Sequence, residues 1–469
     1  MPCQVKNLVS DCRVHLIGIG GIGLSAIAKV LLEEGRRVSG SDLKLSPITD
    51  GLAAQSATIY QGHRAENIGD AELVIVSSAI PADNPEAAAA RARGIPVVKR
   101  DWVLGRMMEG RFGIAVAGSH GKTTITSMIA LVLIEAGLDP TFIVGGIMEN
   151  LGTNASAGRG EHFVIEADEY DRTFLGLRPS IAVVTNIEMD HPDCYPELDD
   201  LVEGFREFVH LVPADGCVIG CGDEERTRGI LGELRGTRGS GAITYGLGEG
   251  VDWRAVDIRS NGLGGHDFVA LHDGCAVGGF GLRIPGLHNV QNSLAVLAVA
   301  HRLDLHLTQV AKTLRGYRGV QRRFEVKGEV DGIVVIDDYA HHPTQIRTTL
   351  RAARERYPGR TIWAVFQPHT YSRTKALLGE FAASFADADH VVVTEIYAAR
   401  ELDDLGVSAA DIVARMRHPD TRYIPGLNEA ADYTFDHLKP GDVLITLGAG
   451  DGCKVGEGIL ARGYRHGIC

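Results

Sequence analysis

The sequence predicts an α/β protein of about three domains, each built around a mostly parallel sheet. The chain has 469 residues, which corresponds to about three domains at roughly 150 residues each. Short apolar runs alternate with helical patterns along the chain, as is typical of βαβ units. Glycine accounts for 58 residues, well above its average usage of about 7%, which suits many tight turns between strands and helices.

The composition excludes several classes of protein. Hydrophobic residues make up 45% of the chain, which is too much for a disordered protein. The net charge of −13 disfavours a nucleic-acid partner, because duplex binding requires a basic face. No apolar run approaches the ~18 residues of a membrane span, and the first residues lack a signal-peptide pattern. We therefore expect no membrane insertion. The eight cysteines are scattered without a CxxC pair, so we expect reduced thiols and a cytoplasmic location.

The first segment, residues 1–108, is predicted to open with a buried strand over 14–19 and a helix over 24–34. Two further strands are expected over 37–40 and 73–78. The first of these stops at Ser41-Asp42 and the second at Ser77-Ser78, and strands that alternate with helical stretches indicate parallel βαβ units.

A glycine-rich turn joins the first strand to the first helix. Its glycines are Gly18, Gly20, Gly21 and Gly23, in a GxGxxG pattern, and Asp42 follows at the end of the next strand. Such a turn leaves bare backbone at a helix N-terminus for a diphosphate, while an acidic residue can bind ribose hydroxyls. An NAD-dependent dehydrogenase is one interpretation of this pattern, and a tight turn without a ligand is another.

The second segment, residues 109–321, begins with a predicted strand over 113–117 and a long helix over 123–135. Further buried strands are expected over 163–167, 181–185 and 216–220. Short, glycine-broken strands between about 240 and 285 are expected to be antiparallel.

The clearest local motif lies between the strand and helix that open this segment. It consists of Gly118, Ser119, His120, Gly121, Lys122, Thr123 and Thr124. In such a loop backbone N–H groups surround phosphates, the lysine reaches the terminal phosphates and the following hydroxyl binds Mg²⁺. A full Walker A motif has glycine six residues before the lysine, where this chain has Val116. Lys122 is the only lysine between Lys99 and Lys312, which makes a surface role for it a weak explanation.

Two strand ends in this segment offer metal ligands. Four carboxylates lie at the end of the strand over 163–167, on Glu166, Asp168, Glu169 and Asp171. They repel one another unless a cation is present, although a solvated acidic turn is an alternative. His191 follows the next strand, either as a metal ligand or as an ordinary loop histidine.

A pair of carboxamides opens a later helical pattern. Asn289 and Asn292 are three residues apart, so they share one helix face. They could read the edge of a base, or they could serve as a helix cap and a surface residue.

The third segment, residues 322–469, is a further α/β unit. Its strands are expected over 333–336, 361–366, 391–395 and 443–447, with a helix over 344–356. The first two strands end in DDYAHHP and QPHTYSRT, which contain His342, His369 and Arg373. Histidines and an arginine at strand ends suit a site for an anionic substrate.

The ordered motifs GSHGKTT, EADEYD, TNIEMDH, GLHNVQN, RRFE, DDYAHHP and FQPHTYSRT resemble those of the Mur ligases, the ATP-dependent amide-forming enzymes of peptidoglycan synthesis. The resemblance implies three domains: a Rossmann-like domain (1–108) for a UDP-linked substrate, a central P-loop ATPase-like domain (109–321), and a Rossmann-like domain (322–469) for an amino acid. The chain departs from some members at Thr370, where they have arginine, and at Tyr170, where they have serine.

The resemblance also implies roles for the nucleotide and metal residues. Lys122 would bind the β- and γ-phosphates of ATP, Thr123 and Glu166 one Mg²⁺, and His191 a second. Nucleotide recognition would involve Asn289, Asn292, Arg323 and Asp338. The predicted helix over 198–210 contains no lysine, whereas several members hold the second Mg²⁺ through a carbamylated lysine there.

The substrate residues follow in the same way. The turn from Gly18 to Gly23 would hold the UDP diphosphate together with Ser77, and His342, His369 and Arg373 would lie near the two reacting substrates. The catalytic set implied is Lys122, Glu166, His191, His342 and Arg373. The reaction implied joins L-alanine to the lactyl carboxylate of UDP-N-acetylmuramate through an acyl phosphate, in a monomer or homodimer. A ligase that recycles murein tripeptide and a P-loop switch protein without bond-forming chemistry are the alternatives.

Overall fold

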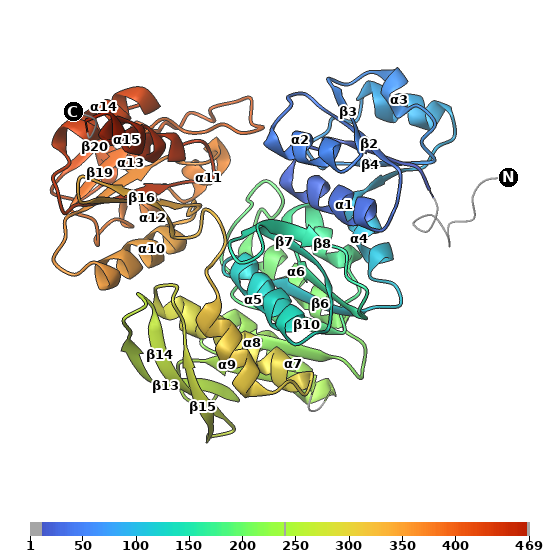
Figure 1. Cartoon of the computed structure of the whole chain (residues 1–469), viewed down its shortest axis with the longest axis horizontal. Helices are drawn as coiled ribbons and strands as arrows, with labels where there is room; N and C mark the ends of the chain where they lie inside the picture. The colour runs from blue at the N-terminus through green and yellow to red at the C-terminus, as the bar shows by residue number, and fades with distance from the viewer. Residues whose placement is uncertain (1–11, 239–240, 467–469) are drawn as a thin grey trace.

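The computed structural model describes residues 12–238 and 241–466, so Cys3 and Cys469 lie outside the described residues. The α/β prediction is confirmed, because three separate sheets follow one another along the chain, each with helices packed on it. In Figure 1 the N-terminal sheet lies at the upper right, the central sheet in the middle and the C-terminal sheet at the upper left. The domain boundaries at 108 and 321 stay predictions.

The N-terminal sheet is entirely parallel, in the order β3-β2-β1-β4-β5. Its strands are β1 (Val14–Ile17), β2 (Val38–Asp42), β3 (Thr58–Gln61), β4 (Leu73–Val76) and β5 (Val97–Lys99). Its helices are α1 (Ile22–Glu33), α2 (Pro47–Ala54), η2 (Ala65–Ile68), α3 (Pro85–Ala92) and α4 (Arg100–Met107). The edge strands β3 and β5 are half-exposed and short, and the apolar pattern therefore did not predict them.

The central sheet has ten strands in the order β15-β14-β13-β12-β11-β10-β6-β9-β7-β8. They are β6 (Phe112–Ala117), β7 (Thr141–Met148), β8 (Thr153–Ser156), β9 (His162–Glu166), β10 (Ile181–Val184), β11 (Cys217–Cys221), β12 (Ala242–Gly246), β13 (Trp253–Ser260), β14 (His266–His272) and β15 (Cys275–Gly281). The helices are α5 (Lys122–Glu135), η3 (Tyr170–Gly176), α6 (Leu198–His210), α7 (Glu225–Arg238), α8 (Leu287–Arg302) and α9 (Leu307–Gly316). The predicted antiparallel pairing is confirmed for β13, β14 and β15.

The C-terminal sheet has the order β16-β17-β21-β18-β19-β20, and only β16 is antiparallel to its neighbour. Its strands are β16 (Glu325–Val330), β17 (Ile333–Asp338), β18 (Ile362–Phe366), β19 (His390–Val393), β20 (Thr421–Tyr423) and β21 (Val443–Leu447). Its helices are α10 (Pro343–Arg356), α11 (Tyr371–Ala376), α12 (Leu378–Ala382), α13 (Ala409–Arg415), α14 (Leu427–His437) and α15 (Cys453–His466). None of the helices in the described part of the chain combines the length and apolar character that a membrane crossing requires.

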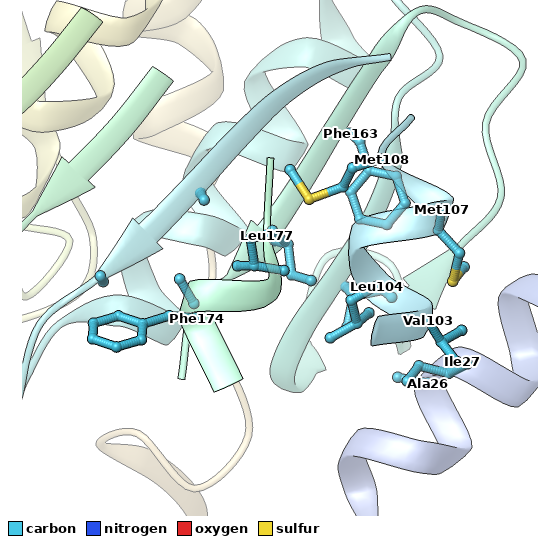
Figure 2. Close-up of a cluster of buried hydrophobic side chains, with 14 of the residues drawn as sticks. Ala26, Ile27, Val103, Leu104, Met107, Met108, Phe163, Phe174 and Leu177 are labelled. Carbon is cyan, nitrogen blue, oxygen red and sulfur yellow. The ribbon is translucent and has the colours of Figure 1, made fainter. Parts of the chain in front are cut away.

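The N-terminal and central sheets share one hydrophobic core. Figure 2 shows Ile27 of α1 against Val103 and Leu104 of α4, with Phe163 and Leu177 of the central domain in the same cluster. Because apolar side chains from both sides are buried together, separating them would expose this surface to water, which is unfavourable. Helix α1 therefore holds the end of the glycine-rich turn against the central domain.

Candidate active site

The P-loop is shaped by the ends of two parallel neighbours, β6 and β10. Gly118 has a φ of +135°, and an added Cβ there would lie 1.9 Å from Thr185 Oγ1, so only glycine fits. Asn186 Oδ1 accepts a hydrogen bond from the His120 backbone N–H at 2.9 Å. Gly121 has a φ of +84° and leads directly into α5, whose N-terminus favours anions.

Lys122 is held inside this loop by a carboxylate. Its Nζ donates to both carboxylate oxygens of Glu169 at 2.8 Å and to the carbonyl of Gly118 at 2.5 Å. Burial opposes the charge on Lys122, but Glu169, Asp168 and Glu166 outweigh burial and raise its pKa. Lys122 is therefore a charged ammonium at neutral pH, and a phosphate must compete with Glu169 for it.

The four carboxylates of the acidic turn do not form a single cluster. Asp168 binds Arg100 at 2.5 Å and Asp171 binds Lys99 at 2.6 Å, which joins this turn to the N-terminal domain. Glu169 binds Lys122 at 2.8 Å. Only Glu166 lacks a cationic partner among the ion pairs of the described residues.

Glu166 is also the carboxylate that fits a magnesium ion. Its Oε1 accepts from Thr123 Oγ1 at 3.0 Å, and its Oε2 accepts from the Gly145 N–H at 2.8 Å. Octahedral Mg²⁺ binds oxygen at about 2.0–2.1 Å, which places neighbouring ligands roughly 2.9 Å apart. Burial raises the pKa of Glu166 despite the nearby Lys122, so a cation beside it would favour the ionised form.

This difference gives a direct test of Glu166 against Asp168. We expect Glu166→Gln to raise the Mg²⁺ concentration needed for half-maximal activity at least tenfold, because it removes an anionic oxygen beside Thr123. Asp168→Asn is the matched control, and we expect it to weaken the contact with Arg100 while leaving the Mg²⁺ dependence near that of the parent. Mg²⁺ titrations of activity in both variants decide, and the opposite pattern would show that Asp168 is the principal ligand.

A buried ion pair joins the central and C-terminal domains. Arg373 Nη2 lies 2.7 Å from Asp190 Oδ1, and the two side chains are 6% and 4% exposed. Burial opposes ionisation, but Arg373 and then His191 lower the pKa of Asp190 well below its usual value. His191, with a φ of +55°, follows directly and lies 5.0 Å from the ring of Tyr170.

Three histidines of the C-terminal domain have different positions. His341 and His369 line the same cavity as Lys122, Glu166 and Arg373, but His342 is not among the lining residues. Burial and the charge of Arg373 lower the pKa of His341 well below its usual value and that of His369 to about 4. Both rings are therefore neutral at pH 7.

His342 instead faces the central domain. Its Nε2 donates to the Met189 carbonyl at 3.2 Å, and its Nδ1 accepts weakly from the N–H of Thr344 at 3.3 Å. The structure thus places His342 at a contact between domains and its neighbour His341 in the cavity.

The predicted base-reading residues lie in a second cavity. Asn289 and Asn292 line it together with Thr124, Arg323 and Asp338. Asn292 Nδ2 donates to Asn289 Oδ1 at 3.2 Å, which fixes the two carboxamides relative to each other. Asp338 accepts from the N–H groups of Phe324 and Ala340 at 2.7 and 2.8 Å, and the second cavity measures about 370 Å³.

The glycine-rich turn of the N-terminal domain only partly reaches the first cavity. Gly23 lines it, whereas Gly18, Gly20, Gly21 and Ser77 do not. Asp42 Oδ2 accepts the N–H of Gly20 at 3.0 Å. Asp42 therefore stabilises the turn itself. Gly18 has a φ of +85°, and a Cβ added there would lie 3.3 Å from Ser77 Cβ, so Ser77 packs directly against the turn.

All three domains contribute to the first cavity, which measures about 480 Å³. Gly23 comes from the N-terminal domain, Lys122 and Glu166 from the central domain, and His369 and Arg373 from the C-terminal domain. The two cavities share the P-loop residues His120, Gly121 and Thr123. A nucleotide on this loop would therefore lie between a base pocket and a substrate pocket.

Several residues at this site were not singled out from the sequence. They are Arg100, Glu169 as the partner of Lys122, Asp190, His341 and Gln345. Asp190 and His341 each stand next to a predicted residue, within TNIEMDH and DDYAHHP, so the motifs themselves contained the signal. Arg100 and Gln345 had no such signal, since their importance arises from contacts between distant segments.

Comparisons with known proteins cover nearly the whole chain. The family models match as "Mur ligase family, catalytic domain" over 13–112, "Mur ligase middle domain" over 116–300, and "Mur ligase, glutamate ligase domain" over 322–450. The UDP-N-acetylmuramate–L-alanine ligase of Desulfatibacillum aliphaticivorans is 45% identical and covers 96% of this chain and 98% of its own. The enzyme of that name from Geobacter sp. (strain M21) is also 45% identical, over 96% of this chain and 97% of its own.

Solved structures agree with this relationship. The UDP-N-acetylmuramate-alanine ligase of Thermotoga maritima superposes with a TM-score of 0.81 at 30% identity, over 97% of this chain and all of that one. The murein peptide ligase of Psychrobacter arcticus superposes with a TM-score of 0.72 at 24% identity, over 96% and 98%, and at that identity shows the fold alone. With matches to all three of its domain models, the chain belongs to the Mur ligase family.

Proposed function

We propose that this protein uses ATP to join L-alanine to the lactyl carboxylate of UDP-N-acetylmuramate, releasing ADP and phosphate. The observation that supports it best is the single cavity in which Gly23, Lys122 and Arg373 come from three different domains. A nucleotide-linked substrate, ATP and an amino acid each need a binding surface, and three domains around one cavity provide them. Relatives that are 45% identical over 96% of this chain bear the name of this activity.

The first chemical step is attack of the lactyl carboxylate on the γ-phosphate of ATP. A carboxylate does not react with an amine at neutral pH without a leaving group, and the acyl phosphate supplies one. Because both reactants are anions, cationic groups must lower their repulsion. Lys122, drawn from Glu169 to the phosphates, and the N-terminus of α5 supply this stabilisation.

The second step is attack of the alanine amine on the acyl phosphate, with phosphate as the leaving group. The attacking nitrogen becomes acidic as its bond to carbon forms, so it must lose a proton. His341 and His369 line the cavity as neutral rings whose pKa values are lowered by burial and Arg373. His341 Nδ1 donates to the Tyr339 carbonyl at 2.9 Å, so its Nε2 lone pair can accept this proton at neutral pH. His369 Nδ1 instead accepts a hydrogen bond from Arg373 Nη1 at 3.2 Å, which positions Arg373.

A bound Mg²⁺ would neutralise phosphate charge in this site. Thr123 and Glu166 would hold it, since their oxygens are 3.0 Å apart. His191, which lines the same cavity as Asp168, would serve a second ion. Helix α6 spans Leu198–His210, as predicted, and contains no lysine.

The absence of that lysine predicts that activity is indifferent to bicarbonate. Carbamylation requires a neutral lysine amine and CO₂, and no residue of α6 offers one. We expect a degassed preparation to show the same rate with and without added bicarbonate, and His191→Ala to raise the Mg²⁺ requirement several-fold. His210→Ala, on the same helix, is the control for a histidine outside the cavity. Bicarbonate stimulation, or an unchanged Mg²⁺ response in His191→Ala, would contradict this prediction.

The proposed function is tested by measuring ATP-dependent product formation with L-alanine, glycine and murein tripeptide side by side. We expect L-alanine to give the highest kcat/KM, and phosphate release to require both UDP-N-acetylmuramate and the amino acid. Without alanine, borohydride should trap the acyl phosphate as the corresponding alcohol. A preference for the tripeptide would reassign the protein to murein recycling, and phosphate release without either substrate would indicate a P-loop switch.

A further inference from the structure

We propose that His120, Glu188 and His342 form an inhibitory binding site for a Zn²⁺-class transition-metal ion between the central and C-terminal domains. His120 belongs to the P-loop, Glu188 follows β10, and His342 is the N-cap residue of α10. Within the described residues, this is the one group of three or more histidine, cysteine or acidic side chains whose ligand atoms all lie within 4.8 Å of one another.

The two distances from Glu188 to the histidines match a zinc coordination shell, and the two histidine nitrogens lie within 4.8 Å of each other. Glu188 Oε2 lies 3.2 Å from His120 Nε2 and 3.6 Å from His342 Nδ1. Zinc takes nitrogen and carboxylate ligands at about 2.0–2.2 Å, and a tetrahedron of that size places neighbouring ligand atoms roughly 3.3–3.5 Å apart. Two histidines and one glutamate also form a known donor set for zinc with an open fourth position.

Two of the three ligands, His342 and Glu188, are already deprotonated, as a metal requires. Burial and His120 lower the pKa of His342 to about 4, so its ring is neutral. Burial opposes the charge of Glu188, but hydrogen bonds from His120 and Thr344 lower its pKa to about 2. Metal ligands must be deprotonated in this way.

Their outer contacts also hold them in place. His342 Nε2 donates to the Met189 carbonyl at 3.2 Å, which leaves Nδ1 as the acceptor nitrogen, 3.6 Å from Glu188 Oε2. A metal at Nδ1 would replace its long hydrogen bond from the Thr344 N–H at 3.3 Å. Thr344 Oγ1 donates to Glu188 Oε2 at 2.6 Å. A ligating histidine that donates its other N–H to a carbonyl, and a ligating carboxylate that accepts a hydrogen bond, are typical of metal sites.

The third ligand, His120, must change its hydrogen bond with Gln345 when a metal binds. Gln345 Oε1 accepts the N–H of His341 at 3.0 Å and that of His342 at 3.3 Å, so its Nε2 is the group 3.0 Å from His120 Nδ1. This donor keeps the His120 proton on Nε2, where it points to Glu188. Metal binding at Nε2 moves that proton to Nδ1, so His120 then needs an acceptor where Gln345 now offers a donor.

The chemistry of the ligands distinguishes this site from the magnesium site. Mg²⁺ prefers oxygen ligands, whereas imidazole nitrogen suits zinc, cobalt, nickel and copper. An ion on His120, Glu188 and His342 would tie the P-loop to α10. It would thereby obstruct the passage between the two cavities, both of which include His120 and Gln345.

The test uses Co²⁺ as a spectroscopic probe, with Mg²⁺ in large excess to fill the oxygen sites. We expect one equivalent of Co²⁺ to give the strong visible absorption of a four-coordinate ion with nitrogen ligands. Glu188→Gln should remove this absorption. His272→Ala is the matched control, because His272 lies 4.5 Å from the ring of His301 and 3.6 Å from Asp273, and it should leave the absorption unchanged.

Gln345→Glu provides a gain of affinity that an adventitious histidine site would not show. Its carboxylate can still accept the N–H groups of His341 and His342, and it offers His120 Nδ1 an acceptor in place of a donor. Outer contacts of this kind alter metal affinity about 10–100-fold, so we expect Co²⁺ to bind at least tenfold more tightly. In the parent, Zn²⁺ should inhibit turnover at saturating Mg²⁺, and Glu188→Gln should abolish that inhibition.

The binding measurements do not depend on turnover, so they stand apart from the proposed ligase activity. Absence of the four-coordinate absorption in the parent would overturn the proposal. So would its survival in Glu188→Gln, or weaker Co²⁺ binding in Gln345→Glu.

Discussion

Replacing Lys122 by alanine should reduce turnover by at least 10³-fold, equivalent to about 4 kcal/mol in the barrier. The reason is that Lys122 is the cation of the P-loop, and two anions must approach each other beside it. The measurement is single-turnover formation of ADP with saturating substrates. A rate within about tenfold of the parent would contradict the assignment of Lys122 to the phosphates.

The partner of Lys122 supplies the control for folding. Glu169 is 1% exposed and binds Lys122 through both oxygens, so Lys122→Ala leaves a buried carboxylate without its cation. Breaking such a pair costs about 3–5 kcal/mol in the free energy of unfolding. We expect the double variant Lys122→Ala, Glu169→Gln to recover most of that stability while remaining inactive, which separates the loss of chemistry from the loss of folding.

Replacing Asp190 by alanine should have the second-largest effect, on both stability and turnover. It leaves Arg373 buried at 6% exposure without the carboxylate that lies 2.7 Å from it. We expect a loss of about 3–5 kcal/mol in the free energy of unfolding and a large fall in kcat, because Arg373 lines the substrate cavity. Denaturant unfolding and steady-state kinetics measure the two effects.

Asp193 is the matched control, because its ion pair with Arg400 at 3.1 Å is 37% and 50% exposed. Exposed pairs contribute about 0–1 kcal/mol, so Asp193→Ala should be nearly neutral. If both variants lose equal stability, the Asp190–Arg373 pair does not hold the domains together. The pKa of Asp190 is lowered in the folded protein, so the contribution of the pair is present at neutral pH and is lost only as pH falls below the ordinary carboxyl value, through the folded one.

Local patterns were sufficient to predict most of the buried elements. Strand β21 spans Val443–Leu447 and α6 spans Leu198–His210, both as expected from runs of apolar or amphipathic residues. Strands β7 and β8 were missed. The first contains Gly145 and Gly146 and the second is short and half-exposed, so neither has the continuous apolar pattern of a buried strand.

The order of the motifs along the chain was enough to determine the fold class, the P-loop and the family. Their placement at strand ends also follows from sequence, because parallel strands gather their carboxyl ends on one edge. The hydrophobic core shared by α1 and the central domain did not follow, since it depends on which apolar surfaces meet in three dimensions.

Only the tertiary structure decided what each charged side chain does. The acidic turn offers four carboxylates, on Glu166, Asp168, Glu169 and Asp171, and only the family resemblance selected Glu166 from the sequence. In the structure, Arg100, Lys122 and Lys99 come from distant segments and pair with the other three. In the same way, the adjacent residues His341 and His342 became a cavity residue and a domain contact, because His342 is the N-cap of α10 and lies 3.6 Å from Glu188. The sequence by itself determined which chemical groups reach the site, and long-range pairing, whose energy depends on distance and burial, determined which of them remain free to act on substrates.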